Sequence, residues 1–240
     1  MNIFFNTILG SLGAVTTVPS TATAVSIEDL NLVFDGNSLT AGVGATGAQD
    51  YPNYVNNDLA NKFNSKTFAS FGVGGQTTQS MISDATTQIY SKYQSGKQNV
   101  LIAWEDANSF NAGRTAQENY DDFKTYFQGA KNAGFEHCIL ITGMYYRKSP
   151  DDTYRNINGA IMPVSRIQNI TDYSDLVYGS DINLVPWDYT IDLRNAPVVG
   201  GAIGQQKDSN WSDAVHLTDS GYRLIANVVT AKIKEIFNII

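Results

Sequence analysis

An aspartate and a histidine stand three residues apart within residues 211–218, near the end of the chain. At this spacing one helical turn or a tight loop can bring the carboxylate of Asp213 to the imidazole of His216. A carboxylate that accepts the Nδ1–H fixes the tautomer of the ring and leaves Nε2 free to act as a base. A solvated pair that caps a helix would have the same spacing, and a metal site would need a third ligand. The pair therefore predicts either a catalytic base or a surface cap.

The other histidine, His137, opens an apolar run at residues 138–141 and is expected to belong to the scaffold. Any step that needs an imidazole is therefore assigned to His216. Two histidines exclude a three-histidine metal site. The single cysteine excludes an intramolecular disulfide and a cysteine-rich zinc site. We therefore predict no metal site.

A serine follows the first expected strand, residues 30–34, in the segment Phe-Asp-Gly-Asn-Ser. A serine in a turn between a strand and a helix is open to solvent, and the N–H groups of the helix N-terminus can stabilise an anion there. Ser38 is therefore a candidate nucleophile. Alternatively, Ser38 or Thr40 only caps a helix. The turn does not match the G-x-S-x-G pattern of the α/β-hydrolases.

A glycine-rich segment, residues 70–77, follows the second expected strand. Glycines let the backbone approach a ligand and point N–H groups at it, which makes Gly75 a candidate donor. A plain turn explains the glycines equally well. A phosphate site is disfavoured because the segment has no Walker or dinucleotide pattern and no lysine follows it.

A third polar segment, residues 104–109, follows the third expected strand and contains Asn108. An asparagine amide offers N–H donors without charge, which suits an oxyanion. An Asx-turn or a helix cap would use the same side chain. Glu105 and Asp106 could instead form a pair of acid and base carboxylates. Adjacent residues at the end of a strand usually point apart, so we favour the amide.

Apolar runs and helical periodicity alternate along the chain from residue 30 onward, which predicts five strands and five helices. Pro163 is expected to kink the fourth helix and Gly134 to end the third. Strands that alternate with helices form a parallel sheet covered on both faces, so the segments after the first three strands should meet at one edge. The strands are predicted over residues 30–34, 66–71, 100–104, 138–142 and 183–186, and the helices over residues 51–63, 77–93, 115–133, 154–170 and 218–237.

In this order the four segments resemble the sequence blocks of the SGNH (GDSL-type) hydrolase family, and the resemblance extends from about residue 30 to residue 237. The resemblance implies a flavodoxin-like, three-layer α/β/α sandwich around a parallel sheet of about five strands. It also implies hydrolysis of esters, thioesters or acetylated sugars, without a metal or a cofactor. The matching blocks are GNSL at 36–39, GVGGQT at 72–77, DANS at 106–109 and DAVH at 213–216.

The resemblance also assigns roles to single residues. It implies that Ser38 is the nucleophile, that His216 is its base and that Asp213 orients the imidazole. The backbone N–H groups of Ser38 and Gly75 and the side-chain amide of Asn108 match the oxyanion hole of the family.

Three positions depart from the blocks of the family. Asn37 stands where the family usually has aspartate, which keeps the size of the side chain and removes its charge. In the third block, Asp106 replaces a glycine and Ser109 replaces an aspartate. A carboxylate at position 106 would oppose an oxyanion if it pointed into the site.

Residues 28–240 are expected to form one SGNH hydrolase-like domain, preceded by an N-terminal arm at residues 1–27. The apolar stretch at residues 3–18 is too short and too polar to span a membrane. Residues 22–24 resemble the cleavage site of a secretory leader, but no lysine or arginine precedes the apolar stretch. We therefore favour an arm that packs on a neighbouring chain, in a homo-oligomer or a larger assembly.

The charge of the chain limits the class of partner. A net charge of −7 argues against nucleic acid, because phosphate binding needs clustered lysine and arginine. Only 16% of the residues are charged, so much of the polarity comes from uncharged side chains. Such surfaces suit sugar contacts and occur on extracellular and virion proteins. An extracellular, cell-surface or virion-associated location is therefore favoured over a cytoplasmic one.

These observations predict a serine esterase that forms an acyl-enzyme intermediate on a small ester or an acetylated polysaccharide. Deacetylation of an O-acetylated carbohydrate is favoured because no long apolar lid is evident, and Trp211 is a candidate contact for a sugar ring. The alternative is a catalytically silent structural or glycan-binding module of a virion or cell-surface assembly. The uncharged polar composition, the arm and the departures of the third block, Asp106 and Ser109, motivate that alternative.

Overall fold

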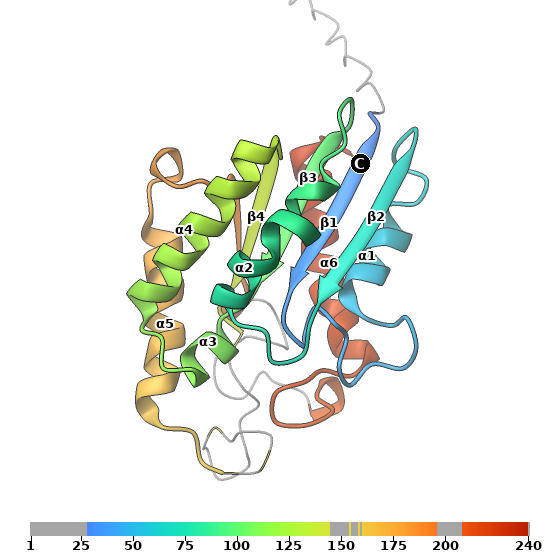
Figure 1. The fold of residues 1–240 in the computed structure, drawn as a ribbon. Coiled ribbons are helices and arrows are strands. Elements are labelled where there is room, and N and C mark those ends of the chain that lie inside the picture. The colour runs from blue at the N-terminus through green and yellow to red at the C-terminus, as the bar shows by residue number, and fades with distance from the viewer. Residues whose placement is uncertain (1–27, 145–153, 155–157, 159, 196–207, 240) are drawn as a thin grey trace, which may run out of the picture.

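A five-stranded parallel sheet lies between two layers of helices in the computed structural model of the chain (Figure 1). The structure describes residues 28–144, 154, 158, 160–195 and 208–239. The expected arm at residues 1–27 therefore lies outside the described residues. Among the helices described, none is long and apolar enough to cross a membrane.

All neighbouring strands of the sheet are parallel, and their order is β2-β1-β3-β4-β5. This order places β1 at the centre of the first three strands, with β2 and β3 on either side of it. The expected three-layer α/β/α sandwich is confirmed. The strands are β1 (Leu30–Gly36), β2 (Lys66–Gly72), β3 (Gln98–Trp104), β4 (His137–Thr142) and β5 (Tyr189–Asp192).

Helices α1 and α6 cover one face of the sheet, and α2, α4 and α5 cover the other, with α3 at the lower edge (Figure 1). Side chains of β1 alternate between the two cores, because Leu32 and Phe34 pack with α1 and α6 whereas Val33 packs with α2 and α4. The helices are α1 (Tyr51–Asp58), α2 (Thr78–Gln88), α3 (Ala107–Asn111), α4 (Ala116–Ala133), α5 (Val164–Gly179) and α6 (Asp219–Ile236).

Local signals set the ends of α4 as expected. Thr115 and Glu118 form a reciprocal capping box at its start. Gly134, with φ +109°, ends the helix in the left-handed conformation that favours glycine.

The predicted fourth helix, at residues 154–170, is wrong in its position. Helix α5 begins at Val164, directly after Pro163, and continues to Gly179. Pro163 is the N-cap, with ψ 138°, and the helix begins only after it because a proline cannot continue a helix from a preceding turn. The apolar spacing of α5 continues through Tyr173 and Val177, both of which are buried.

The predicted fifth strand, at residues 183–186, is also wrong. Asp181 accepts a hydrogen bond from the backbone of Asn183, and this contact starts a short 3-10 turn, η2 (Ile182–Leu184). The strand β5 lies a few residues later and forms an edge of the sheet. Its side chains are mostly half-buried, so its sequence lacks the apolar run of a central strand. Three further 3-10 turns are η1 (Tyr90–Lys92), η3 (Leu193–Asn195) and η4 (Asp208–Asn210).

A buried carboxyl group, that of Asp35, lies near the end of the central strand β1. It accepts hydrogen bonds from the Tyr126 hydroxyl at 2.6 Å and from the Gly36 N–H at 2.8 Å. Burial raises the pKa of Asp35 to about 7, although these two hydrogen bonds act to lower it. The folded chain therefore holds a proton on Asp35 under conditions in which the unfolded chain releases it.

This proton makes stability fall as the pH rises from about 4, where an unfolded aspartate ionises, to about 7. The side chain of Asp35→Asn is neutral at every pH. The free energy of unfolding of this variant should therefore fall less steeply over this range, by up to about 1.4 kcal/mol per pH unit. Urea unfolding at several pH values measures the slope. Asp121→Asn, on the exposed side of α4, is the matched control and should keep the wild-type slope. An unchanged slope in Asp35→Asn would contradict the assignment.

Candidate active site

Four segments that are far apart in the sequence meet at the carboxyl ends of β1, β2 and β3. In a sheet of this order, the connections that follow β1 and β3 lead toward opposite edges of the sheet. Parallel sheets bind ligands at the point where the connections diverge in this way. A cavity of about 310 Å³ lies here, and Ser38, Gly75, Asn108 and His216 all line it. The sequence prediction that these segments share one edge of the sheet is therefore confirmed in space.

A continuous chain of hydrogen bonds joins three side chains at this cavity. The Ser38 Oγ lies 2.9 Å from His216 Nε2, and His216 Nδ1 lies 2.8 Å from Asp213 Oδ2. With the ring proton on Nδ1, the imidazole donates to the carboxylate and accepts from the serine hydroxyl. Ser38 and His216 are 178 residues apart in the sequence, so only the fold brings them together.

The loop that carries the histidine holds the carboxylate in place. Asp213 Oδ1 accepts the backbone N–H groups of Val215 and His216, both at 2.7 Å. Partial burial acts to raise the pKa of Asp213, but the hydrogen bonds from His216 and Val215 outweigh it and lower that pKa below its usual value. The carboxylate is thus kept ionised beside the imidazole.

A tight loop, and not a helical turn, brings the side chains of Asp213 and His216 together. Trp211 and Leu217 form an antiparallel bridge, and the Ser212 N–H donates to the His216 carbonyl at 2.9 Å. Thr218 then caps α6 by accepting the Gly221 N–H. The surface-cap interpretation of the pair does not fit, because His216 is only 8% exposed and faces Ser38.

A set of turns, and not a helix, follows Ser38. The Asn37 side chain accepts the Leu39 N–H at 2.9 Å, and the Val43 N–H donates to the Ser38 carbonyl at 2.9 Å. Helix α1 begins only after its cap, Asp50. The expectation that Ser38 or Thr40 stands at a helix N-terminus is therefore wrong, because the chain closes into consecutive turns before α1 begins.

Two candidate donors face the cavity beside Ser38. Gly75 has φ +79°, a left-handed conformation that favours glycine. The Asn108 amide donates one hydrogen bond to the Gln76 carbonyl at 3.0 Å, which leaves its second N–H for a ligand. This bond ties the glycine segment to α3.

Asp106 is buried and is not among the residues that line the cavity. Burial raises its pKa to about 7, against the lowering effect of hydrogen bonds from the backbone of Gly143 and Ala107. A negative group at position 106 therefore does not point into the space beside Ser38, which answers the concern raised by the departure from the glycine of the block.

Trp211 does not form the expected contact for a sugar ring at this cavity. Trp211 is 5% exposed and packs in the core with α6, and Trp104 and Trp187 are buried as well. None of the three lines the cavity. Its apolar wall comes instead from Val43, Met162 and Val215, among the described residues.

Sequence reasoning missed these lining residues and also Asn111. Asn111 lies one turn after Asn108 in α3, so the helical spacing could have found it. Met162 comes from a distant segment, and no local pattern marks it.

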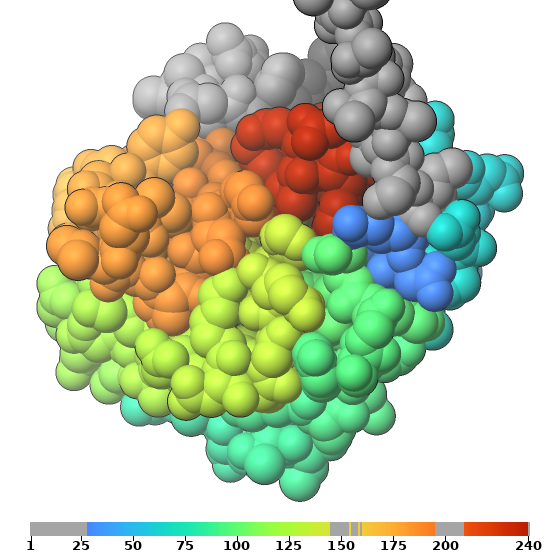
Figure 2. Space-filling model, turned by 90° about the horizontal axis from the view of Figure 1, so that it is seen from above, coloured from blue at the N-terminus to red at the C-terminus, as the bar shows by residue number. Residues whose placement is uncertain are grey.

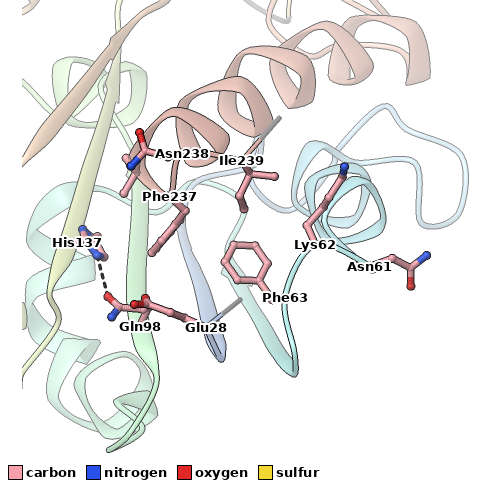
Figure 3. A pocket seen from close by; sticks show the side chains of 10 residues that line it. Glu28, Asn61, Lys62, Phe63, Gln98, His137, Phe237, Asn238 and Ile239 are labelled. Carbon is pink, nitrogen blue, oxygen red and sulfur yellow. Dashed lines mark hydrogen bonds between the residues drawn. The ribbon is translucent and has the colours of Figure 1, made fainter. Parts of the chain in front are cut away.

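A larger cavity, of about 480 Å³, lies at the opposite end of the sheet. Figure 2 looks onto this end, where the start of β1 and the end of α6 lie near each other. His137 lines the cavity, pairs with Gln98 at 3.0 Å and meets the Phe237 ring edge-on (Figure 3). Burial lowers the pKa of His137. No residue of the four sequence blocks lines this cavity, in agreement with a scaffold role for this histidine.

Within the described ranges, no three histidine, cysteine, aspartate or glutamate side chains gather in a way that could hold a metal ion.

Comparison with known proteins identifies relatives. The model of the GDSL-like lipase/acylhydrolase family matches residues 34–224, which is well over half of the chain. Among curated proteins, none matches the chain.

Solved structures share the fold at low sequence identity. A member of the lipolytic protein G-D-S-L family from Veillonella parvula has 17% identity and a TM-score of 0.58, over 84% of this chain and 97% of that one. An acetyl xylan esterase, AlAXEase, has 19% identity and a TM-score of 0.61, over 85% and 99%. A mutant of an acetyl-xylooligosaccharide esterase from Geobacillus has 14% identity and a TM-score of 0.62, over 85% and 93%.

The end of β2 packs directly against the turn that carries Ser38, which gives a test of the backbone. A Cβ at Gly72 would lie 2.1 Å from the Ala41 nitrogen, whereas a Cβ at Gly74 would meet nothing within 4 Å. Gly72→Ala should therefore lower the free energy of unfolding by about 1–3 kcal/mol, measured in urea. Gly74→Ala is the matched control and should leave it within about 0.5 kcal/mol. Equal effects of the two variants would contradict the close approach.

Proposed function

Because the chain belongs to the GDSL-like lipase/acylhydrolase family, we propose that it is a serine esterase that works through an acyl-enzyme intermediate. The observation that carries the proposal is the hydrogen-bonded chain from Asp213 through His216 to Ser38 at the mouth of a cavity. A nucleophile, a base and a residue that orients the base are the groups that acyl transfer needs.

In the first step the Ser38 Oγ attacks the ester carbonyl carbon, and the hydroxyl proton passes to His216 Nε2. Asp213 stabilises the imidazolium that forms, because its carboxylate already accepts the Nδ1–H. Negative charge develops on the former carbonyl oxygen. The N–H groups of Ser38 and Gly75 and the free N–H of Asn108 stabilise that charge.

The bond between the carbonyl carbon and the alkoxy oxygen then breaks, which completes formation of the acyl-enzyme. His216 gives its proton to the departing alcohol, and the acyl group remains on Ser38. A water molecule, deprotonated by His216, attacks this ester, and the acid leaves as Ser38 regains its proton.

One of the three motives for the silent-module alternative is that Asp106 would disturb the oxyanion donors. The buried position of Asp106, away from the cavity lining, supports an enzyme instead.

Ser38→Ala and His216→Ala should each lower kcat for p-nitrophenyl acetate by about 10⁶-fold, because the residues of such a unit act together. Steady-state hydrolysis measures kcat, and thermal unfolding shows that each variant is folded. His137→Ala is the matched control, since this histidine lies at the other end of the sheet, and its kcat should stay near that of the wild type. Undiminished turnover in Ser38→Ala would refute the proposal.

For the substrate we propose an O-acetylated carbohydrate. The cavity is small, and uncharged amides, Asn108 and Asn111, line it together with a short apolar wall. Such a site suits a short acyl group on a polyhydroxyl alcohol. The fold similarity to two esterases whose names include acetyl xylan and acetyl-xylooligosaccharide supports the same substrate class.

A series of p-nitrophenyl esters tests the acyl preference. We expect kcat/KM to be highest for acetate and to fall by about tenfold or more at eight carbons, because each misplaced group loses roughly 1 kcal/mol or more. Release of acetate from acetylated xylan checks the alcohol side, with Ser38→Ala as the control. A protein that cleaves only long-chain esters would contradict this substrate class.

A further inference from the structure

We propose that Glu105 is a positioning residue, whose single carboxyl group holds the turn of the nucleophile and the helix of the oxyanion asparagine in register. The inference deepens the proposed function and rests on the roles given there to Ser38 and Asn108. It concerns a buried group that the acyl-transfer steps do not use.

Each oxygen of the Glu105 carboxylate accepts a hydrogen bond from a different segment. Oε2 accepts from the Asn37 side-chain nitrogen at 2.5 Å, and Oε1 accepts from the Ser109 backbone N–H at 2.6 Å. Asn37 directly precedes Ser38, and Ser109 directly follows Asn108. One side chain therefore bridges the neighbours of the nucleophile and of the oxyanion donor.

The same network reaches the glycine segment. The Ser109 hydroxyl accepts the Thr78 N–H at 3.0 Å at the start of α2, three residues after Gly75. Thr78 in turn donates to the Asn119 side chain at 2.7 Å. Glu105, Ser109, Thr78 and Asn119 are all buried, so water does not substitute for a lost partner.

The hydrogen bonds of Asn37 fix the orientation of its side-chain amide. Its oxygen accepts the Leu39 N–H at 2.9 Å, so its nitrogen must face Glu105. An amide at position 37 and a carboxylate at position 105 are therefore complementary. Asn37 and Ser109 are also two of the three positions at which this chain departs from the blocks of its family, and both departures contact this one carboxylate.

The environment of Glu105 explains why it needs two donors. Burial, and next the charge of Asp106, raises the pKa of Glu105 to about 8, whereas the hydrogen bonds from Asn37 and Ser109 act to lower it. Because a buried oxygen of this carboxyl group is costly without a hydrogen-bond partner, the loss of either donor disturbs the local structure.

An exchange of the two groups tests the bridge. In Glu105→Gln the new amide nitrogen faces the Asn37 nitrogen, and in Asn37→Asp two carboxylates face each other. In the double variant the new amide at position 105 can donate to the new carboxylate at position 37 and still accept from Ser109. That carboxylate still accepts the Leu39 N–H through its other oxygen. The polarity of the pair is reversed, and every hydrogen bond is restored.

We expect each single variant to lower kcat for p-nitrophenyl acetate by about tenfold or more, with KM within about threefold, because Glu105 does not line the cavity. The double variant should recover kcat to within about threefold of the wild type. Glu136→Gln, which changes a carboxylate that accepts the Asn99 N–H at 2.9 Å at the far end of the sheet, is the control and should keep the wild-type kcat.

Three outcomes overturn the positioning role: single variants with wild-type kcat, a double variant no better than the singles, or an equal loss in Glu136→Gln. If a single variant does not fold, the double variant decides, because only a restored bridge returns folded, active protein. Failure of the proposed function is a separate result, since it shows as an inactive wild type or an active Ser38→Ala.

Discussion

The hydrogen bond between the Ser38 hydroxyl and His216 Nε2 depends on how the last helix, α6, packs against the central strand β1. Helix α6 packs on the same face of the sheet as α1, and further bonds fix its first turn to the loop after Ser38. The Tyr222 hydroxyl donates to the Val43 carbonyl at 2.7 Å, and the Asp219 carboxylate accepts the Thr46 N–H at 2.7 Å. These bonds hold the two ends of the domain together at the site, and a shift of α6 would separate His216 from Ser38.

Two buried carboxyl groups form hydrogen bonds to segments next to the site. Asp35 and Glu105 lie at the ends of neighbouring central strands, and burial raises the pKa of both. Hydrogen bonds from Tyr126, Asn37 and Ser109 satisfy them. A polar network of this kind fixes a unique arrangement of turns, because each donor has one acceptor, whereas apolar packing alone would tolerate more than one. The low charge of the sequence thus coexists with carboxyl groups that are placed in the interior.

The fold could be predicted from the sequence wherever burial gave a continuous apolar run, as in β1, β3 and β4. It could not be predicted for β5, because an edge strand is half-buried and its composition is mixed. At the site, the spacing of Asp213 and His216 and the position of Ser38 after a strand marked them as candidates, and the fold brings the three side chains together. The contact of Glu105 with Asn37 spans 68 residues, so no local pattern could indicate it.

The central claim is that Ser38 is a nucleophile activated by His216, and covalent labelling tests it most directly. The folded protein is treated with a fluorophosphonate, and the adduct is located by mass spectrometry of the intact chain and of its peptides. One adduct per chain is expected, on Ser38, and His216→Ala should form it far more slowly. An adduct on another serine, or no adduct on the folded wild type, would contradict the claim.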